Sequence, residues 1–418
     1  MSGIKIDPTP AVRPPKIPSK FDVIPIHASD RGTFKKCRRK WDWSSPMRHN
    51  LQQKVEFSGL YIPLWFGSGV HYALAQYYNP VLQRDPVETF LWWYDLQMNG
   101  GICNEEQLDL VYDRKPKQYV HNGTVQFEVR GLYDLLPTYD IEEYEEHREL
   151  GIGMLNYYKE YAAENDSFAV ICEEHTFSVP VMQKMMHGED QPLSAIDPRD
   201  GKVKPVHIRG TQDAIIQDLE YGLFGILEHK TAAAIDENYH RKLEKDEQCT
   251  TYMYAGEIEA RQHGLEYEKI SFVLYNALRK AFPKPPTPTK SGLFSINRQT
   301  ESTTPGMLRE YIERNGLEVV VEADEKLQAY VEYVERSGGE QFIKRNYVRR
   351  NRAEIESCGE RIYMEVSDML DPHVRIYPNP TGEHSCLNCI FRSPCIARDD
   401  GSEWQLILDD QFEENWTR

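Results

Sequence analysis

The stretches Gly210-Thr-Gln-Asp-Ala-Ile-Ile216 and Leu227-Glu-His-Lys230 decide the fold of this chain. Both alternate apolar and polar residues, which predicts two strands joined by a tight turn as a β-hairpin. With the turn centred midway between them, Asp213 lies directly opposite Glu228, and their Cβ atoms are about 5 Å apart. Lys230 follows Glu228 by two residues and shares its face of the strand.

Two carboxylates at that separation repel each other unless a proton or a cation lies between them. A hard divalent ion such as Mg²⁺ or Mn²⁺ is the natural occupant. The ammonium of Lys230 could then orient an attacking water and offset the charge of a phosphodiester in the transition state. The alternative is that Asp213, Glu228 and Lys230 form an ion-pair cluster on a solvated strand face.

The surrounding segments predict an α/β protein. Helical spacing over 246–263 follows the hairpin, and a strand is expected over 269–275, which gives a β-β-α-β order. Upstream, Gly67-Ser68 caps a helix predicted over 68–78, with His71 in its first turn. A single basic helix capped by Ser29 or Asp30 is expected over 31–41.

The chain divides into six expected segments. These are a disordered Pro-rich arm (1–20), N-terminal helices with Cys37 and His71 (21–80), a helical insertion (81–165), the α/β core (166–280), a mobile Pro-rich loop (281–306) and C-terminal helices with a Cys-rich segment (307–418).

Four elements follow one another in the sequence: a helix with His71, a strand with Asp213, the Glu-x-Lys of Glu228 and Lys230, and a helix with Gln248 and Tyr252. In this order they resemble the PD-(D/E)XK nuclease superfamily, specifically its RecB-like branch. The resemblance implies a restriction-endonuclease-like core, with a mixed central sheet flanked by helices. It also implies a metal-dependent DNA exonuclease that favours single-stranded ends, in recombination, repair or phage DNA metabolism.

The resemblance assigns roles to individual residues. Asp213, Glu228, His71 and the backbone carbonyl of His229 would hold Mg²⁺ or Mn²⁺, and Asp213, Glu228 and Lys230 would be catalytic. Gln248 and Tyr252, one helical turn apart, would position a nucleotide by hydrogen bonding and stacking. Glu174 stands where the family often has a further acidic residue, although neighbouring Glu173 fits nearly as well.

Three cysteines, Cys386, Cys389 and Cys395, are closely spaced near the C-terminus and need a fourth ligand for a metal site. The candidate is Cys37 in the basic N-terminal segment. This arrangement resembles the iron–sulfur staple of RecB-like nucleases, including the AddB nuclease and the CRISPR-associated RecB-like exonucleases, and implies a 4Fe-4S cluster that joins the N- and C-terminal segments into one subdomain. Structural zinc and unligated thiols are the alternatives.

Basic residues from two segments would line a channel for the phosphates of a single strand once the cluster brings the chain ends together. With Gln248 and Tyr252, the candidate DNA-binding residues are Arg31, Lys35, Lys36, Arg38, Arg39, Arg349 and Arg350.

The composition narrows the setting. The 418 residues carry 49 Lys and Arg against 66 Asp and Glu, a net charge of −17, which argues against coating of nucleic acid by the whole surface. No apolar run approaches a membrane span and no phosphate-binding GxxxxGK[ST] motif occurs, so we expect neither a membrane nor ATP as a partner. We expect a cytoplasmic protein, in the host cytoplasm if it is phage-encoded.

Two other functions stay open at this point. An endonuclease, or a flap or RNA nuclease, would use the same catalytic groups. A catalytically idle nucleic-acid-binding scaffold would keep the fold, but it would have no need of Asp213, Glu228 and Lys230 together.

Overall fold

The computed structural model describes residues 22–54, 61–105, 107–111, 116–121, 124–136, 141–185, 189–263, 269–297, 302–380 and 386–414. The Pro-rich arm expected over 1–20 lies outside the described residues. In the part of the chain that is described, no helix is long and apolar enough to cross a membrane.

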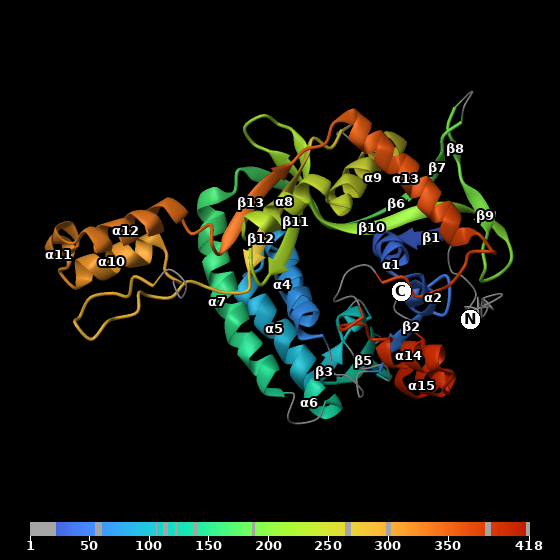
Figure 1. The fold of residues 1–418 in the computed structure, drawn as a ribbon, viewed down its shortest axis with the longest axis horizontal. Helices are drawn as coiled ribbons and strands as arrows, with labels where there is room; N and C mark the ends of the chain where they lie inside the picture. Colours follow the sequence, from blue (N-terminus) through green and yellow to red (C-terminus); the bar gives the residue numbers. More distant parts are fainter. Residues whose placement is uncertain are drawn as a thin grey trace.

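A mixed seven-stranded sheet forms the centre of the molecule (Figure 1). Along one edge, its long strand β10 pairs with β6 in an antiparallel arrangement. Along the other edge, the first part of β10 pairs with β1 in parallel, and its last part pairs with β11 antiparallel. The sheet continues from β11 to β12 in parallel and to β13 antiparallel. The strands are β1 (Ile24–His27), β6 (Phe168–Pro180), β9 (Ser194–Ile196), β10 (Val203–Asp218), β11 (Phe224–Ala232), β12 (Phe272–Arg279) and β13 (Ile343–Val348).

The register of the β10–β11 hairpin is the one that the sequence predicts. Ala214 pairs with Leu227 and Gln217 with Phe224. Continued by one residue, this register brings Asp213 opposite Glu228. The expected α/β fold with a mixed sheet is therefore confirmed.

Helices cover both faces of the sheet (Figure 1). On one face, α4 (Ile62–Tyr78), α5 (Pro86–Asn99) and α7 (Ile141–Asn165) share an apolar core with sheet residues such as Leu227 and Leu274. On the other face, α1 (Ala28–Lys36), α9 (Glu247–His263) and α13 (Arg352–Leu370) enclose Ile226 and Val273. Because side chains alternate along a strand, each strand of the hairpin contributes to both cores.

Residues 81–165 are not purely helical, which corrects the expectation for this segment. Between α5 and the short α6 (Leu132–Leu135) lies a three-stranded antiparallel sheet, formed by β3 (Gly100–Cys103), β4 (Lys117–His121) and β5 (Thr124–Arg130). Strand β5 alternates Val125, Phe127 and Val129 with polar residues, a pattern that is typical of strands.

Two helix boundaries also differ from the expected ones. The basic N-terminal helix is broken into α1 and α2 (Arg38–Ser44), because Cys37 adopts an extended backbone with φ −164° and ψ 113°. Helix α4 begins at Ile62 instead of Ser68, so His71 lies in its third turn and not its first.

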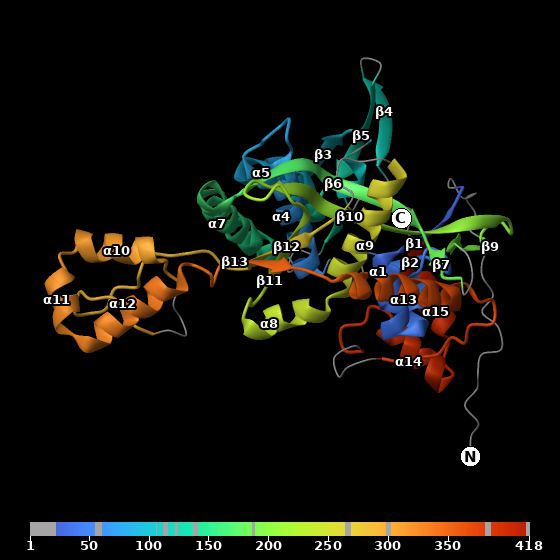
Figure 2. The same cartoon turned by 90° about the horizontal axis from the view of Figure 1, so that it is seen from above.

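The two ends of the described chain lie side by side (Figures 1 and 2). β2 (Leu51–Gln53) pairs antiparallel with β14 (Phe412–Glu414), and the ring of Trp43 packs 5.3 Å from Phe391 and 6.0 Å from Trp404. These contacts join α2 to the C-terminal helices α14 (Arg392–Asp400) and α15 (Trp404–Gln411).

A small helical lobe stands apart from the sheet (Figures 1 and 2). Its helices α10 (Pro305–Arg314), α11 (Glu318–Ala323) and α12 (Glu325–Ser337) enclose their own apolar cluster, which includes Phe294 from the preceding loop. The other elements within the described residues are β7 (Met182–Gln183), β8 (Gln191–Pro192), α8 (Glu237–Arg241) and the 3₁₀ helices Leu108–Leu110 and Lys242–Lys245.

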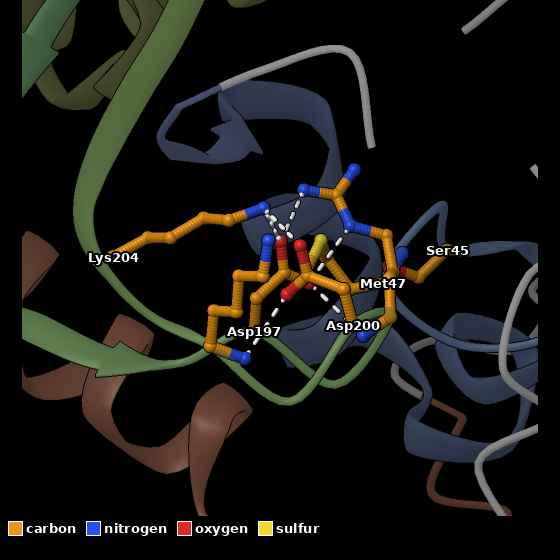
Figure 3. Close-up of polar contacts among 7 residues, drawn as sticks. Ser45, Met47, Asp197, Asp200 and Lys204 are labelled. Atoms are coloured by element: carbon orange, nitrogen blue, oxygen red, sulfur yellow. Dashed lines mark hydrogen bonds and ion pairs between the residues drawn. The ribbon is translucent and has the colours of Figure 1, made fainter. Parts of the chain in front are cut away.

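A buried carboxylate fixes the turn between β9 and β10 (Figure 3). Asp197 is fully buried, and its carboxylate accepts hydrogen bonds from Arg199 Nε and Nη2 at 2.9 Å and from Lys204 Nζ at 2.9 Å. Burial opposes ionisation of this carboxyl, but the bonds from Arg199 and Lys204 lower its pKa to about 2.

This carboxylate predicts an acid-dependent contribution to stability. Because the folded pKa of Asp197 is below its unfolded value of about 3.9, the stabilisation is present above about pH 4 and is lost as the pH falls towards 2. Between pH 5 and pH 2 the wild type should lose roughly 2 kcal/mol more free energy of unfolding than Asp197→Asn does. Urea unfolding at both pH values measures this difference, with Asp409→Asn, an exposed carboxylate of α15 outside this cluster, as the control. Equal losses in the wild type and Asp197→Asn would contradict the prediction.

Candidate active site

The structure brings together the polar residues that the sequence singles out from four elements. β10 supplies Asp213, β11 supplies Glu228 and Lys230, α9 supplies Gln248, and α4 approaches from the opposite face to supply His71. The site lies where the ladder between β10 and β11 ends, because the last paired residues before it are Ala214 and Leu227.

Asp213 is held by two groups. The backbone N–H of His229 donates to Asp213 Oδ2 at 2.6 Å, and His71 Nδ1 lies 3.4 Å from Asp213 Oδ1. Burial opposes ionisation of Asp213, but the charge and hydrogen bond of His71 hold its pKa well below the usual range. Burial likewise opposes the charged form of His71, and the attraction of Asp213 nevertheless raises the pKa of that imidazole. The Asp213 carboxylate is therefore ionised and can offer its oxygens as ligands to a cation.

Glu228 is almost completely buried, at 1% exposure. Its Oε1 accepts hydrogen bonds from Lys230 Nζ and from Gln248 Nε2, the latter at 2.9 Å. Its Oε2 is buried and has no hydrogen-bond partner. Burial raises the pKa of Glu228 well above its usual range, and repulsion from Asp213 adds to the rise. Glu228 thus carries a buried acceptor that only a proton or a cation can satisfy.

Lys230 remains charged in these surroundings. Burial acts against its ammonium, but the carboxylates of Glu228 and Asp213 raise its pKa overall. With part of its side chain accessible, at 31% exposure, the ammonium borders both the carboxylates and solvent. It can therefore hold an anionic group that approaches Glu228.

Gln248 and Tyr252 form a relay to Glu228, which corrects the expected role of Tyr252. Gln248 Nε2 donates to Tyr252 Oη at 2.7 Å, and Tyr252 Oη donates to the carbonyl of Thr211 at 2.7 Å. The ring of Tyr252 is 5% exposed and packs 5.8 Å from Phe177. A ring in the core cannot stack on a nucleotide, so Tyr252 instead orients the amide that donates to Glu228.

Glu174 is a further carboxylate of the site. It has a left-handed backbone with φ 45°, which is uncommon for a residue other than glycine. The residue is exposed, yet loss of hydration and the charge of Asp213 raise the pKa of its carboxyl to about 7. Glu173, the alternative from the sequence, is instead hydrogen-bonded to Asn79.

The donor set fits a hard divalent cation. Asp213 and Glu228 offer carboxylate oxygens, one of them without a partner, and oxygen ligands are those that Mg²⁺ and Mn²⁺ prefer. Among the described residues, however, no group of three or more His, Cys, Asp or Glu side chains is arranged to hold a metal ion.

The basic residues of the two expected DNA-binding segments have different surroundings. Arg31 is buried and pairs with Glu365 at 2.6 Å, and Arg39 is buried and pairs with Asp399 at 2.6 Å. These two guanidiniums join elements of the fold and do not lie on an open surface. Lys35 pairs with Glu247, and Arg350 donates to Thr250 Oγ1 at 2.9 Å.

Lys36, Arg38 and Arg349 are the more accessible members of the basic set. Lys36 and Arg349 are exposed, and the guanidinium of Arg349 lies 5.7 Å from the ring of Tyr347. Arg38 is half-buried between the rings of Phe34 and Tyr377, at 4.9 and 5.5 Å.

The fold brings Cys37 back to the C-terminal cysteines. Burial raises the pKa of the Cys389 and Cys395 thiols, and nearby Cys37 adds to the rise at both. Cys386 also adds to the rise at Cys389. Arg39 Nη1 lies 3.3 Å from Cys395 Sγ. All four thiols are free, and as stated above they do not form a ligand group in the described structure.

The chain matches a known protein family. The family model described as the PD-(D/E)XK nuclease superfamily matches residues 28–396, which is most of the chain. No curated protein matches the chain.

Proposed function

Since the chain belongs to the PD-(D/E)XK nuclease superfamily, we propose that it is a metal-dependent DNA exonuclease of the RecB-like branch, acting at single-stranded ends. Membership of the superfamily implies a nucleic-acid substrate and hydrolysis of phosphodiester bonds. The observation that carries the proposal is the buried, unpartnered Oε2 of Glu228 beside the ionised Asp213 and the ammonium of Lys230.

Each group in the site has a chemical task. Asp213, Glu228 and the backbone carbonyl of His229 would hold Mg²⁺ or Mn²⁺. In place of the expected contact with the metal, His71 would support Asp213, because its Nδ1 lies 3.4 Å from Asp213 Oδ1. The cation would polarise the phosphate and lower the pKa of a bound water. Lys230 holds a phosphate oxygen beside Glu228 and offsets the charge that develops in the transition state. Gln248 keeps the Glu228 carboxylate in place through its 2.9 Å bond.

Glu174 has a separate task in the proposal. Its carboxyl, with a pKa raised to about 7, exchanges protons with solvent near neutral pH. It could therefore protonate the leaving oxygen or take a proton from the attacking water.

We also propose a 4Fe-4S cluster held by Cys37, Cys386, Cys389 and Cys395, with zinc as the alternative. The proximity of Cys37 to Cys389 and Cys395 supports it. The N–H of Arg39 directed at Cys395 Sγ also supports it, because hydrogen bonds to thiolate sulfur stabilise the charge of a cluster.

The assay that tests exonuclease activity compares linear with covalently closed circular single-stranded DNA, in Mg²⁺ and in Mn²⁺. We expect the linear strand to be degraded to mononucleotides or short products and the circle to survive. Linearisation of the circle would establish an endonuclease instead, and parallel flap and RNA substrates test the remaining alternatives. Lys230→Ala protein, purified in the same way, controls for contaminating nucleases.

A further inference from the structure

Behind the carboxylates, on the reverse face of the sheet, two polar side chains lie side by side. His229 of β11 and Asn276 of β12 are partners in the parallel ladder, and both are buried, at 3% and 0% exposure. Their neighbours on this face are apolar, with Leu227 and Leu274 packed against α4 and α7. Apolar residues at 229 and 276 would therefore complete the same core without the cost of burying polar groups.

The side chain of Asn276 fixes the ring of His229. Its Nδ2 donates to His229 Nδ1 at 2.8 Å and to Tyr158 Oη at 2.9 Å. Its Oδ1 accepts from Arg345 Nε at 3.2 Å. Both donors and the acceptor of this amide are engaged, so it has a single favourable orientation.

Arg345 and Tyr78 hold this arrangement from two sides. Arg345 pairs with Asp166 Oδ1 at 2.6 Å, and its guanidinium lies 5.1 Å from the ring of Tyr161. The ring of Tyr78 stacks on His229 at 5.5 Å and an interplanar angle of 20°, while its hydroxyl donates to Asp166 Oδ2 at 3.0 Å. The same acidic residue thus anchors the guanidinium and the stacking ring.

The network reaches the active site through the backbone. His229, whose ring it holds, is the residue whose N–H donates to Asp213 Oδ2 at 2.6 Å. We propose that Asn276 and Arg345 are positioning residues, which hold the His229 ring and thereby the backbone amide that orients the Asp213 carboxylate. This inference rests on the proposed nuclease function and names the part of the fold that sets the geometry of its site.

The test compares Asn276→Leu with Gln97→Leu. Gln97 is another buried amide, in α5, whose Nε2 donates to the carbonyl of Leu110 at 2.6 Å, so both variants lose a buried hydrogen bond and gain an apolar side chain. Thermal unfolding, kcat, Kd for DNA and the affinity for Mn²⁺ without DNA are measured for both. Only Asn276→Leu should lower kcat and Mn²⁺ affinity, by about 10- to 100-fold, with Kd for DNA unchanged.

Two variants of His229 keep the proposal testable if Asn276→Leu does not fold. His229→Leu removes the acceptor of one Asn276 N–H but keeps an apolar side chain beside Leu227, and it should have reduced kcat and Mn²⁺ affinity. His229→Gln, whose Oε1 can accept the bond from Asn276, should recover part of both. Unchanged kcat and Mn²⁺ affinity in His229→Leu would overturn the proposal. Absence of cleavage by the wild type would overturn the nuclease function instead, and Mn²⁺ affinity would still report on the positioning role.

Discussion

Replacing Glu228 by Gln should abolish DNA cleavage while leaving the protein at least as stable as the wild type. The buried carboxylate is repelled by Asp213, and its Oε2 has no partner, so a neutral amide relieves a cost in the folded state. The same change removes a proposed metal ligand. Loss of function together with retained or raised stability is typical of a residue whose surroundings serve catalysis.

The measurement combines a cleavage assay with thermal unfolding. Lys230→Ala should reduce cleavage by about 100- to 1,000-fold, since it removes the positive charge beside the scissile phosphate. Lys184→Ala is the matched control: Lys184 is an exposed lysine paired with Glu360 outside the site, and its loss should leave cleavage unchanged. Cleavage at the wild-type rate by Glu228→Gln would refute the assignment of the active site.

Protein purified without oxygen should be brown and contain about four iron and four sulfide per chain, as expected for a single 4Fe-4S cluster with four cysteine ligands. Cys37→Ser should lose the cluster. Because Cys37 lies between α1 and α2, the variant should also loosen the packing of α2 on α15 and become more sensitive to proteases.

Iron analysis and limited proteolysis measure these effects, with Cys172→Ser as the control. Cys172 lies in β6, outside the cysteine group, and its loss should leave the iron content unchanged. A colourless protein with one tightly held zinc would replace the cluster by a zinc site and leave the nuclease proposal intact. Full iron content in Cys37→Ser would show that the cluster does not join the chain ends.

The β10–β11 hairpin could be predicted because its determinants are local. Alternation of side chains and a short turn fix the register of β10 and β11, and the register alone brings Asp213 opposite Glu228. The expected start of α9 at residue 246 differs by one residue from the observed start at Glu247, because helical spacing is also a local signal.

Features that depend on distant partners could not be predicted. No glycine or proline marks the break at Cys37, and the burial of Arg31 depends on Glu365, which lies 334 residues further along the chain. The role of Tyr252 depends on Phe177, and the network around His229 depends on Arg345. A sequence motif gives the residue types at a site, while long-range packing decides which of them face the substrate.

The helical lobe enters and leaves the sheet at adjacent points, because Leu278 of β12 pairs with Ile343 of β13. In topological terms, the lobe is the loop of an oversized β-hairpin. The entropy of closing a flexible loop grows by only about 0.6 kcal/mol with each doubling of its length, so the strand pairing sets little constraint on what the loop contains. The junction is therefore a natural attachment point, at which evolution or engineering can exchange one module for another without disturbing the order of the strands that carry Asp213 and Glu228.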